Sequence, residues 1–180
     1  SAHIGLNDIE SQLDYIDTIG IKAVFVPWVS KEDLADKLPE IVEKIKKIKP
    51  ELDKRGVTFG YHNHNQEYAD GTDRVQDLLS AIPGFYSEID TYWVKRAGLQ
   101  QYGKQLYCLH IKEYDKNNEE INPVVGEGDV GFEEVFKLGN QMGIKLAILE
   151  VEGFPCDPAE YLKRSYENMK KMSEKVLRLG

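Results

Sequence analysis

Cysteine is scarce in this chain of 180 residues: only Cys108 and Cys156 occur, and they do not form a CxxC pair. This excludes a disulfide framework and a CxxC type of zinc or redox site. Long apolar runs are also missing, since no stretch approaches the roughly 18 residues that cross a bilayer. No secretory segment stands at the start. We therefore expect a cytoplasmic protein with no membrane partner.

Positive charge is in short supply as well. The 23 Lys and Arg residues face 31 Asp and Glu residues, which gives a net charge of −8. Proteins that bind nucleic acid through its phosphates present a basic surface. The locally basic stretch at 44–49 alternates with isoleucines at helical spacing, which indicates a solvated helix face. We therefore expect no nucleic-acid partner.

Length and composition indicate an ordinary globular domain. A chain of 180 residues can bury a sizeable core, and 41% hydrophobic and 30% charged residues are typical of such proteins. There is no low-complexity tract and no Gly/Ser linker. We therefore expect a single domain over 1–180.

Five segments have the composition of β-strands, and helix-like or mixed stretches separate them. A repeated strand-then-helix order implies a parallel sheet with helical crossovers, so the expected fold class is α/β. Pro39 is expected to break or kink the second helical pattern, because proline donates no backbone hydrogen bond and clashes with the preceding turn. The predicted strands are 22–28, 57–62, 85–90, 106–111 and 145–152, and the predicted helices are 9–19, 34–55, 75–82 and the stretch from 158 onward.

Metal-ligand side chains stand at the ends of the last four predicted strands. They are His62, Asp90, His110 and Glu150. In parallel α/β folds the carboxyl ends of the strands lie on one face, where the active site is built. We therefore expect these four side chains to converge.

Five motifs follow one another along the chain. They are GYHNHNQEY at 60–68, SEIDTYW at 87–93, LHIKEYD at 109–115, VGEGDV at 125–130 and ILEVE at 148–152. In this order they resemble the sugar phosphate isomerase/epimerase family of xylose-isomerase-like TIM barrels, whose relatives include tagatose epimerases, inosose dehydratases and dehydroshikimate dehydratases. Each motif alone is weak, but the resemblance covers nearly the whole chain.

The resemblance implies a divalent cation held by Glu, Asp, His and Glu at the ends of barrel strands five to eight. Asp90, His110 and Glu150 match the second, third and fourth of these positions, and His62 falls at the first. An imidazole there shifts the preference from magnesium toward manganese, zinc or iron. It also removes a carboxylate that relatives use as one of two proton-transfer bases. Glu150 and His62 are the catalytic candidates.

The resemblance also implies an activity and a set of substrate contacts. The expected protein is a metal-dependent isomerase or epimerase, or a related lyase, acting on a keto-sugar or polyol derivative. A cation stabilises the enediolate that forms when a proton leaves the carbon next to a carbonyl, and a carboxylate beside it transfers the proton. Lys116 stands where epimerases have arginine, which weakens bidentate oxygen recognition. The candidate substrate-binding residues are His64, Glu67, Trp93, Lys112 and Lys116.

The same alignment implies a partial TIM barrel. The segment 23–28 matches the fourth of eight barrel strands, and residues 1–6 look like the end of a strand followed by its loop. The chain would then correspond to about strands four to eight, without the N-terminal three. Open sheet edges favour association, so a homo-oligomer is expected for such a fragment standing alone.

Several alternatives stay open. Asp90 could cap the following helix instead of binding metal, and Glu152 shares the strand face of Glu150. The loop at 126–128 resembles a phosphate-binding turn but could be a plain loop. For the whole chain, the competing functions are a non-catalytic sugar-binding remnant of the family and, less favoured because of the negative charge, an endonuclease-IV-like repair enzyme.

Overall fold

The computed structural model describes residues 1–178, and within these the side chains of Asp70, 95–97 and 176–178 are left out. The chain divides into two compact units, Ser1–Glu88 and Ile89–Gly180. The division falls within one strand, β4 (Tyr86–Asp90). Each unit is described by itself.

The first unit contains four parallel strands in the order β1-β2-β3-β4. The expected strand end near the N-terminus is confirmed as a short strand, β1 (Ala2–His3), which pairs with β2 (Ala23–Val26). Strand β3 (Thr58–His62) lies between β2 and β4. All four residues of β2 are buried, as a parallel strand covered on both faces requires.

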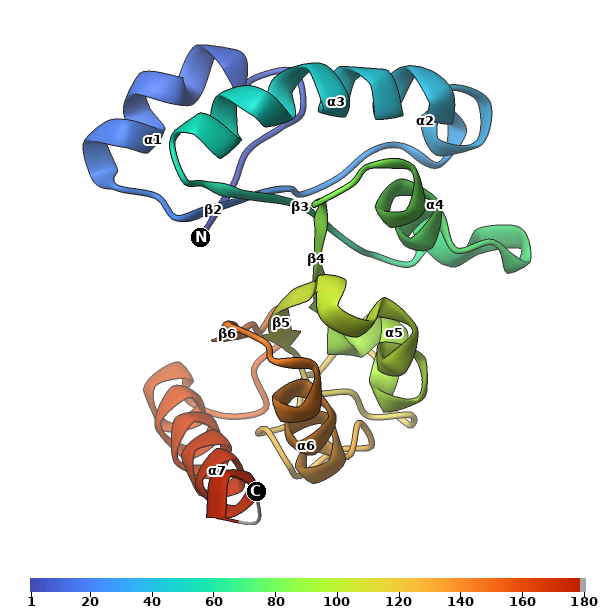
Figure 1. The fold of residues 1–180 in the computed structure, drawn as a ribbon. Coiled ribbons are helices and arrows are strands. Elements are labelled where there is room, and N and C mark those ends of the chain that lie inside the picture. The colour runs from blue at the N-terminus through green and yellow to red at the C-terminus, as the bar shows by residue number, and fades with distance from the viewer. Residues whose placement is uncertain (179–180) are drawn as a thin grey trace. The chain divides into compact units, whose positions relative to one another are not determined.

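Helices follow the strands of this unit (Figure 1). They are α1 (Leu13–Ile19), α2 (Lys31–Asp36), α3 (Leu38–Lys54) and α4 (Arg74–Ala81), with 3₁₀ segments at Glu10–Gln12 and Gln66–Gly71. Gly20 ends α1 with φ of 67°, a left-handed conformation that glycine adopts without strain. The Ser30 hydroxyl caps α2 by accepting the Asp33 N–H at 3.1 Å.

The break predicted at Pro39 is confirmed. Helix α2 ends at Asp36, and α3 begins with Pro39 in its first turn, where a missing N–H costs nothing. One face of α3 is buried and includes Ile41, Ile45 and Ile48. The lysines between them are exposed or half-buried, so the basic stretch is a solvated helix face as expected.

The second unit begins at the end of β4 and holds β5 (Leu106–Ile111) and β6 (Leu146–Leu149), which pair in parallel. Its helices are α5 (Thr91–Gly98), α6 (Phe132–Met142) and α7 (Pro158–Arg178), with a 3₁₀ segment at Leu99–Gln105. Helix α6 packs against α7. The sequence patterns did not single out α5 and α6.

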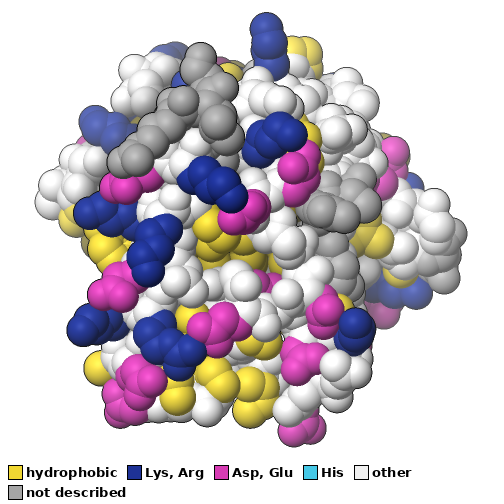
Figure 2. Space-filling view, turned by 90° about the horizontal axis from the view of Figure 1, so that it is seen from below, with side chains coloured by type: hydrophobic (Ala, Val, Ile, Leu, Met, Phe, Trp, Pro, Cys, Tyr) yellow, Lys and Arg dark blue, Asp and Glu magenta, His cyan; other side chains and the backbone are white. Residues whose placement is uncertain are grey.

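The carboxyl ends of three strands lie together in this unit. Strand β4 ends at Asp90 and β5 carries His110 next to its last residue, while Glu150 directly follows β6. On the face drawn in Figure 2, Lys and Arg side chains are interspersed with Asp and Glu side chains. Among the described residues, no helix is both long and apolar enough to cross a membrane.

Candidate active site

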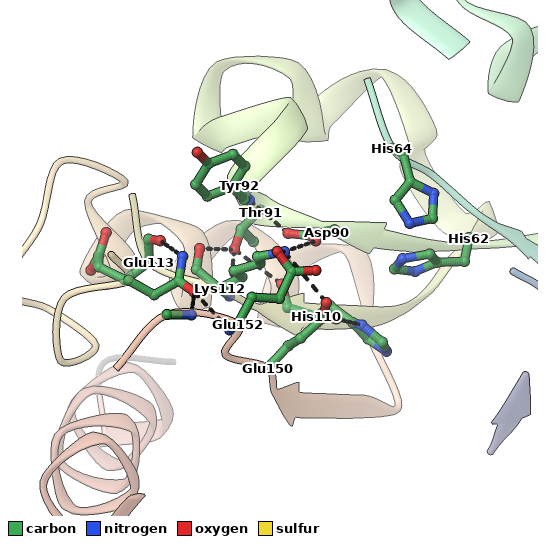
Figure 3. A network of polar contacts seen from close by, with 12 residues as sticks. His62, His64, Asp90, Thr91, Tyr92, His110, Lys112, Glu113, Glu150 and Glu152 are labelled. Atoms are coloured by element: carbon green, nitrogen blue, oxygen red, sulfur yellow. Dashed lines mark hydrogen bonds and ion pairs between the residues drawn. The ribbon is translucent and has the colours of Figure 1, made fainter. Parts of the chain in front are cut away.

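A buried lysine surrounded by carboxylates occupies the strand ends of the second unit (Figure 3). The Lys112 ammonium lies 2.7 Å from Glu152 Oε2, 3.5 Å from Glu150 Oε1 and 3.8 Å from Asp90 Oδ2. His110 Nδ1 contacts the other oxygen of Glu150. Three of the four predicted metal ligands, Asp90, His110 and Glu150, therefore come together around a residue that was predicted to bind substrate.

The two oxygens of Asp90 have different partners. Its Oδ1 accepts the Tyr92 N–H at 2.8 Å and so caps the start of α5. Its Oδ2 faces Lys112 instead. Burial, followed by the negative charge of Glu150, raises the pKa of Asp90 to about 7. The site therefore holds carboxylates close together at a cost in free energy, and an added cation would reduce that cost.

The charge of Lys112 is held in place. Its side chain is only 2% exposed, and this burial lowers its pKa. The hydrogen bond that it donates to Glu152 and the charges of Asp90 and Glu150 outweigh burial and raise the pKa above its ordinary value. Lys112 is therefore protonated at neutral pH. It can donate hydrogen bonds and stabilise negative charge, but it cannot accept a proton.

Aromatic rings form one side of this cluster. The Lys112 ammonium lies 5.2 Å from the centre of the Tyr92 ring and 5.7 Å from that of Trp93, within the range of cation–π attraction. Tyr92 packs edge-on against Trp93 and against Tyr114. Trp93, a predicted substrate-binding residue, thus lies beside a fixed positive charge, and Tyr92 extends its apolar surface.

Thr91 positions this part of β5, and sequence reasoning did not single it out. Its hydroxyl oxygen lies 3.0 Å from the carbonyl oxygens of both His110 and Lys112, and it accepts the Lys112 N–H at 3.1 Å. The side chain is fully buried. One hydroxyl therefore holds the backbone on either side of Ile111, so that His110 and Lys112 keep their directions.

Glu113 organises the loop that resembled a phosphate-binding turn. Its carboxylate accepts the N–H groups of Tyr114, Gly126 and Val130 at 2.8 to 3.0 Å. A Cβ at Gly128 would lie 2.4 Å from the Tyr114 carbonyl oxygen and 2.6 Å from Glu113 Cγ, so only glycine fits there. The N–H groups of Gly126 and Val130 are thus used by this internal anion. The structure thus favours a plain loop over a phosphate-binding turn.

We expect Glu113→Gln to destabilise the protein by about 2–3 kcal/mol, because an amide presents one acceptor oxygen to three N–H donors. Burial raises the pKa of Glu113, while its backbone hydrogen bonds lower it. Urea denaturation measures the loss, and amide hydrogen exchange is expected to increase at 124–130. Glu120→Gln, at an exposed residue, is the control. An unchanged midpoint in Glu113→Gln would contradict this role.

Asn122 connects the same loop to the segment after β6. Its amide donates to the Glu113 carbonyl at 3.1 Å, and its oxygen accepts the N–H groups of Glu152 and Gly153 at 2.8 and 3.2 Å. Asn122 is 3% exposed. It therefore sets the course of the chain just beyond Glu150, and no sequence signal had marked it.

Two predicted substrate contacts have other partners. Glu67, in the first unit, is fully buried and accepts the Tyr61 hydroxyl and the His64 N–H, each at 2.7 Å. Burial raises the pKa of Tyr61. In the second unit, the Lys116 side chain is 68% exposed and its ammonium lies 3.4 Å from Asp129. Contact of Glu67 or Lys116 with a substrate stays a prediction.

The predicted histidines of the first unit lie at and just beyond the end of β3. The His62 and His64 rings pack edge-on with centroids 4.9 Å apart. His62 is 2% exposed, and its Nδ1 lies 3.4 Å from Glu88 Oε1. His62 lies next to Glu88 and His3, and neither of these two was predicted as a site residue.

Comparison with known proteins identifies the relatives of this chain. Residues 4–172 match the family model described as the xylose isomerase-like TIM barrel. No curated protein matches significantly.

Solved structures give the same fold at low identity. A sugar phosphate isomerase/epimerase from Parabacteroides distasonis is 19% identical with a TM-score of 0.70, and covers 93% of this chain and 63% of its own. A D-psicose 3-epimerase from Clostridium cellulolyticum, determined with D-tagatose, is 14% identical with a TM-score of 0.69. The match covers 96% of this chain and 70% of the epimerase. A xylose isomerase-like TIM barrel protein from Mycobacterium smegmatis, in complex with magnesium, is 11% identical with a TM-score of 0.73. The match covers 95% of this chain and 67% of that protein. The chain thus spans about two thirds of their length.

Proposed function

Because the chain belongs to the family of xylose isomerase-like TIM barrels, we propose that it serves in a metal-dependent isomerisation, epimerisation or related lyase reaction of a keto-sugar or polyol derivative. The observation that carries this proposal is the cluster of Asp90, His110 and Glu150 around Lys112. At these identities the solved structures support the fold alone. An epimerase determined with a ketose among them agrees with the proposed substrate class.

The donor set of the second unit suits a divalent cation. One carboxylate oxygen from each of Asp90 and Glu150 lies within 4.8 Å of the other, and the His110 imidazole contacts Glu150. With Glu152, three carboxylates share one ammonium, so negative charge is left to balance a cation. Two carboxylates with an imidazole favour manganese, zinc or iron over magnesium. His62 and His64 remain proposed as a further ligand or base from the family pattern.

The residues around the cation have distinct proposed tasks. When bound, the cation supplies Lewis acidity that stabilises negative charge on the substrate carbonyl oxygen. Glu150 removes and returns the proton on the neighbouring carbon. His110 contacts Glu150 and fixes its carboxylate, and Lys112 donates hydrogen bonds to substrate oxygens. Tyr92 and Trp93 exclude water from one side.

Solvent exchange tests the proposal directly. The full-length protein, loaded with Mn²⁺, is incubated in D₂O with ketohexoses and ketopentoses, and NMR follows loss of the proton next to the keto group. Exchange with at least one ketose is expected. Binding of these sugars without exchange would favour the non-catalytic sugar-binding alternative instead.

We also propose that the protein is cytoplasmic. Within this setting we propose that the chain forms a homo-oligomer through its last strand. Next to β6 lies a hollow of about 370 Å³, lined by residues that include Phe136, Ile144 and Leu146. Ala147 on this strand is exposed. Light scattering is expected to give a mass above the 20.6 kDa of one chain. Ala147→Lys should lower it and Ala159→Lys, at an exposed residue of α7, should not. A monomer at all concentrations would refute this.

A further inference from the structure

Two imidazoles converge on one buried carboxylate within the first unit. The His3 Nε2 and His62 Nδ1 atoms both approach Glu88 Oε1, the first in direct contact and the second at 3.4 Å. The two rings lie 4.8 Å apart, and a ligand atom from each of the three side chains lies within 4.8 Å of the others. Glu88 is fully buried and His62 is 2% exposed.

The strand register creates this convergence. His62 and Glu88 are direct partners on β3 and β4, so their side chains share a face of the sheet. His3 is the partner of Phe25 on β2, and Phe25 is the partner of Gly60, two residues before His62. The three side chains are thus on the same face at neighbouring levels. Sequence patterns could not show this, because 85 residues separate His3 from Glu88.

An apolar side chain, Phe25, lies at the level of His3 and one level below His62 and Glu88. A Cβ at Gly60 would be 2.6 Å from the Phe25 ring, so the ring uses the space that glycine leaves. Phe25 is fully buried. The His3 side chain is 36% exposed, so the cluster is open to solvent at His3. An ion can therefore enter and keep water on its open side.

Two imidazole nitrogens and one carboxylate oxygen are a donor set with a known preference. Two histidines and a glutamate hold zinc in many sites with an open coordination position. The nitrogen donors favour zinc, iron, cobalt or nickel, whereas magnesium and calcium prefer oxygen alone. The buried carboxylate supplies the negative charge that makes a dication stable in this place.

We propose that His3, His62 and Glu88 bind a zinc-class divalent cation in the first unit, in addition to the cation that the proposed function requires in the second. His62 is then a ligand of this ion, and the first unit has a metal site of its own. This inference uses only contacts inside Ser1–Glu88. Because His62 is also proposed for the reaction, the site is tested at His3 and Glu88, which the proposed reaction does not use.

Zinc binding to the full chain tests the proposal. The apo protein is titrated with Zn²⁺ by calorimetry, and X-ray absorption at the zinc edge reports the ligands, with Zn–N distances of about 2.0–2.1 Å expected for imidazole. His3→Ala and Glu88→Gln should each weaken this site by at least about 100-fold, more than the loss typical of outer partners of a ligand. His3→Ala should disturb folding less than Glu88→Gln, because the His3 side chain is 36% exposed and belongs to a strand of only two residues.

Two controls separate this site from its alternatives. His64→Gln removes a nearby imidazole outside the set and should keep the site; equal loss in that variant would overturn the assignment. Asp90→Asn should impair the cation of the second unit and leave this one bound. Undiminished zinc binding in both His3→Ala and Glu88→Gln would show that the three side chains form only an ion pair. Loss of ketose exchange alone, with zinc still bound here, would refute the proposed function and not this site.

Discussion

Glu150→Gln is expected to reduce solvent deuterium exchange next to the keto group by at least about 100-fold, the lower end for acid–base catalysis. Glutamine keeps the shape of the side chain but cannot accept the proton. It also presents an amide to His110 Nδ1 and to the Lys112 ammonium, which both contact the carboxylate in the native protein. Turnover should fall more than ketose binding, because the base acts in the transition state.

Glu152→Gln is the matched control, because Glu152 contacts the same lysine. Its side chain is 72% exposed against 27% for Glu150, and it lies 2.7 Å from Lys112 at the solvent side of the cluster. We expect a decrease of less than about tenfold, consistent with loss of an exposed ion pair. Undiminished exchange in Glu150→Gln would assign the base to another residue, with His62, His64 and Glu67 as the next candidates.

Measurement of metal content separates the two tasks proposed for Glu150. If Glu150→Gln binds Mn²⁺ normally but exchanges slowly, the carboxylate acts as the base. If excess Mn²⁺ restores exchange, its main contribution is to hold the cation. A full recovery at saturating Mn²⁺ would therefore contradict the proton-transfer assignment.

The sequence predicted the strands well because each strand carries its own signal. Strand β5 has the predicted bounds, and β3 and β4 differ by one residue at the start. The predictions at 22–28 and 145–152 were too long, because β2 spans only Ala23–Val26 and β6 only Leu146–Leu149. The prolines also gave local and reliable information, at Pro39 and at Pro158, where α7 begins. Helices α5 and α6 were not predicted with residue bounds. Helix α5 follows β4 directly, without a loop that would have marked its start.

Spacing and family resemblance singled out Asp90, His110 and Glu150 as one group, but not the contacts that hold the group. Thr91 acts on backbone 19 and 21 residues away, and Glu113 accepts N–H groups 13 and 17 residues away. Such side-chain to backbone bonds leave no periodic signal in a sequence. The sequence could not show which role Lys112 has, because a lysine near carboxylates can bind substrate, balance charge or both. Its contacts in the structure were needed to tell these roles apart.

Lys112→Met is expected to destabilise the metal-free protein by about 2–3 kcal/mol. Removing one member of a buried ion pair typically costs about 3–5 kcal/mol, and the exposure of Glu152 reduces this. Methionine has a similar length and fills the space beside Tyr92 and Trp93, so the effect reports charge rather than a cavity. For a chain of this size the loss corresponds to a decrease in Tm of roughly 5–10 °C.

The diagnostic result is the response of this variant to metal. Without the ammonium, Asp90, Glu150 and Glu152 face one another with no counter-charge from Lys112, so Mn²⁺ should raise the Tm of Lys112→Met more than that of the native protein. Differential scanning calorimetry with and without Mn²⁺ measures both shifts. Lys116→Met is the control, since the Lys116 side chain is 68% exposed and its ion pair should contribute less than about 1 kcal/mol. A stability loss in Lys112→Met that Mn²⁺ does not reduce would mean that these carboxylates do not share a cation, and the metal-dependent reaction would lose its main support.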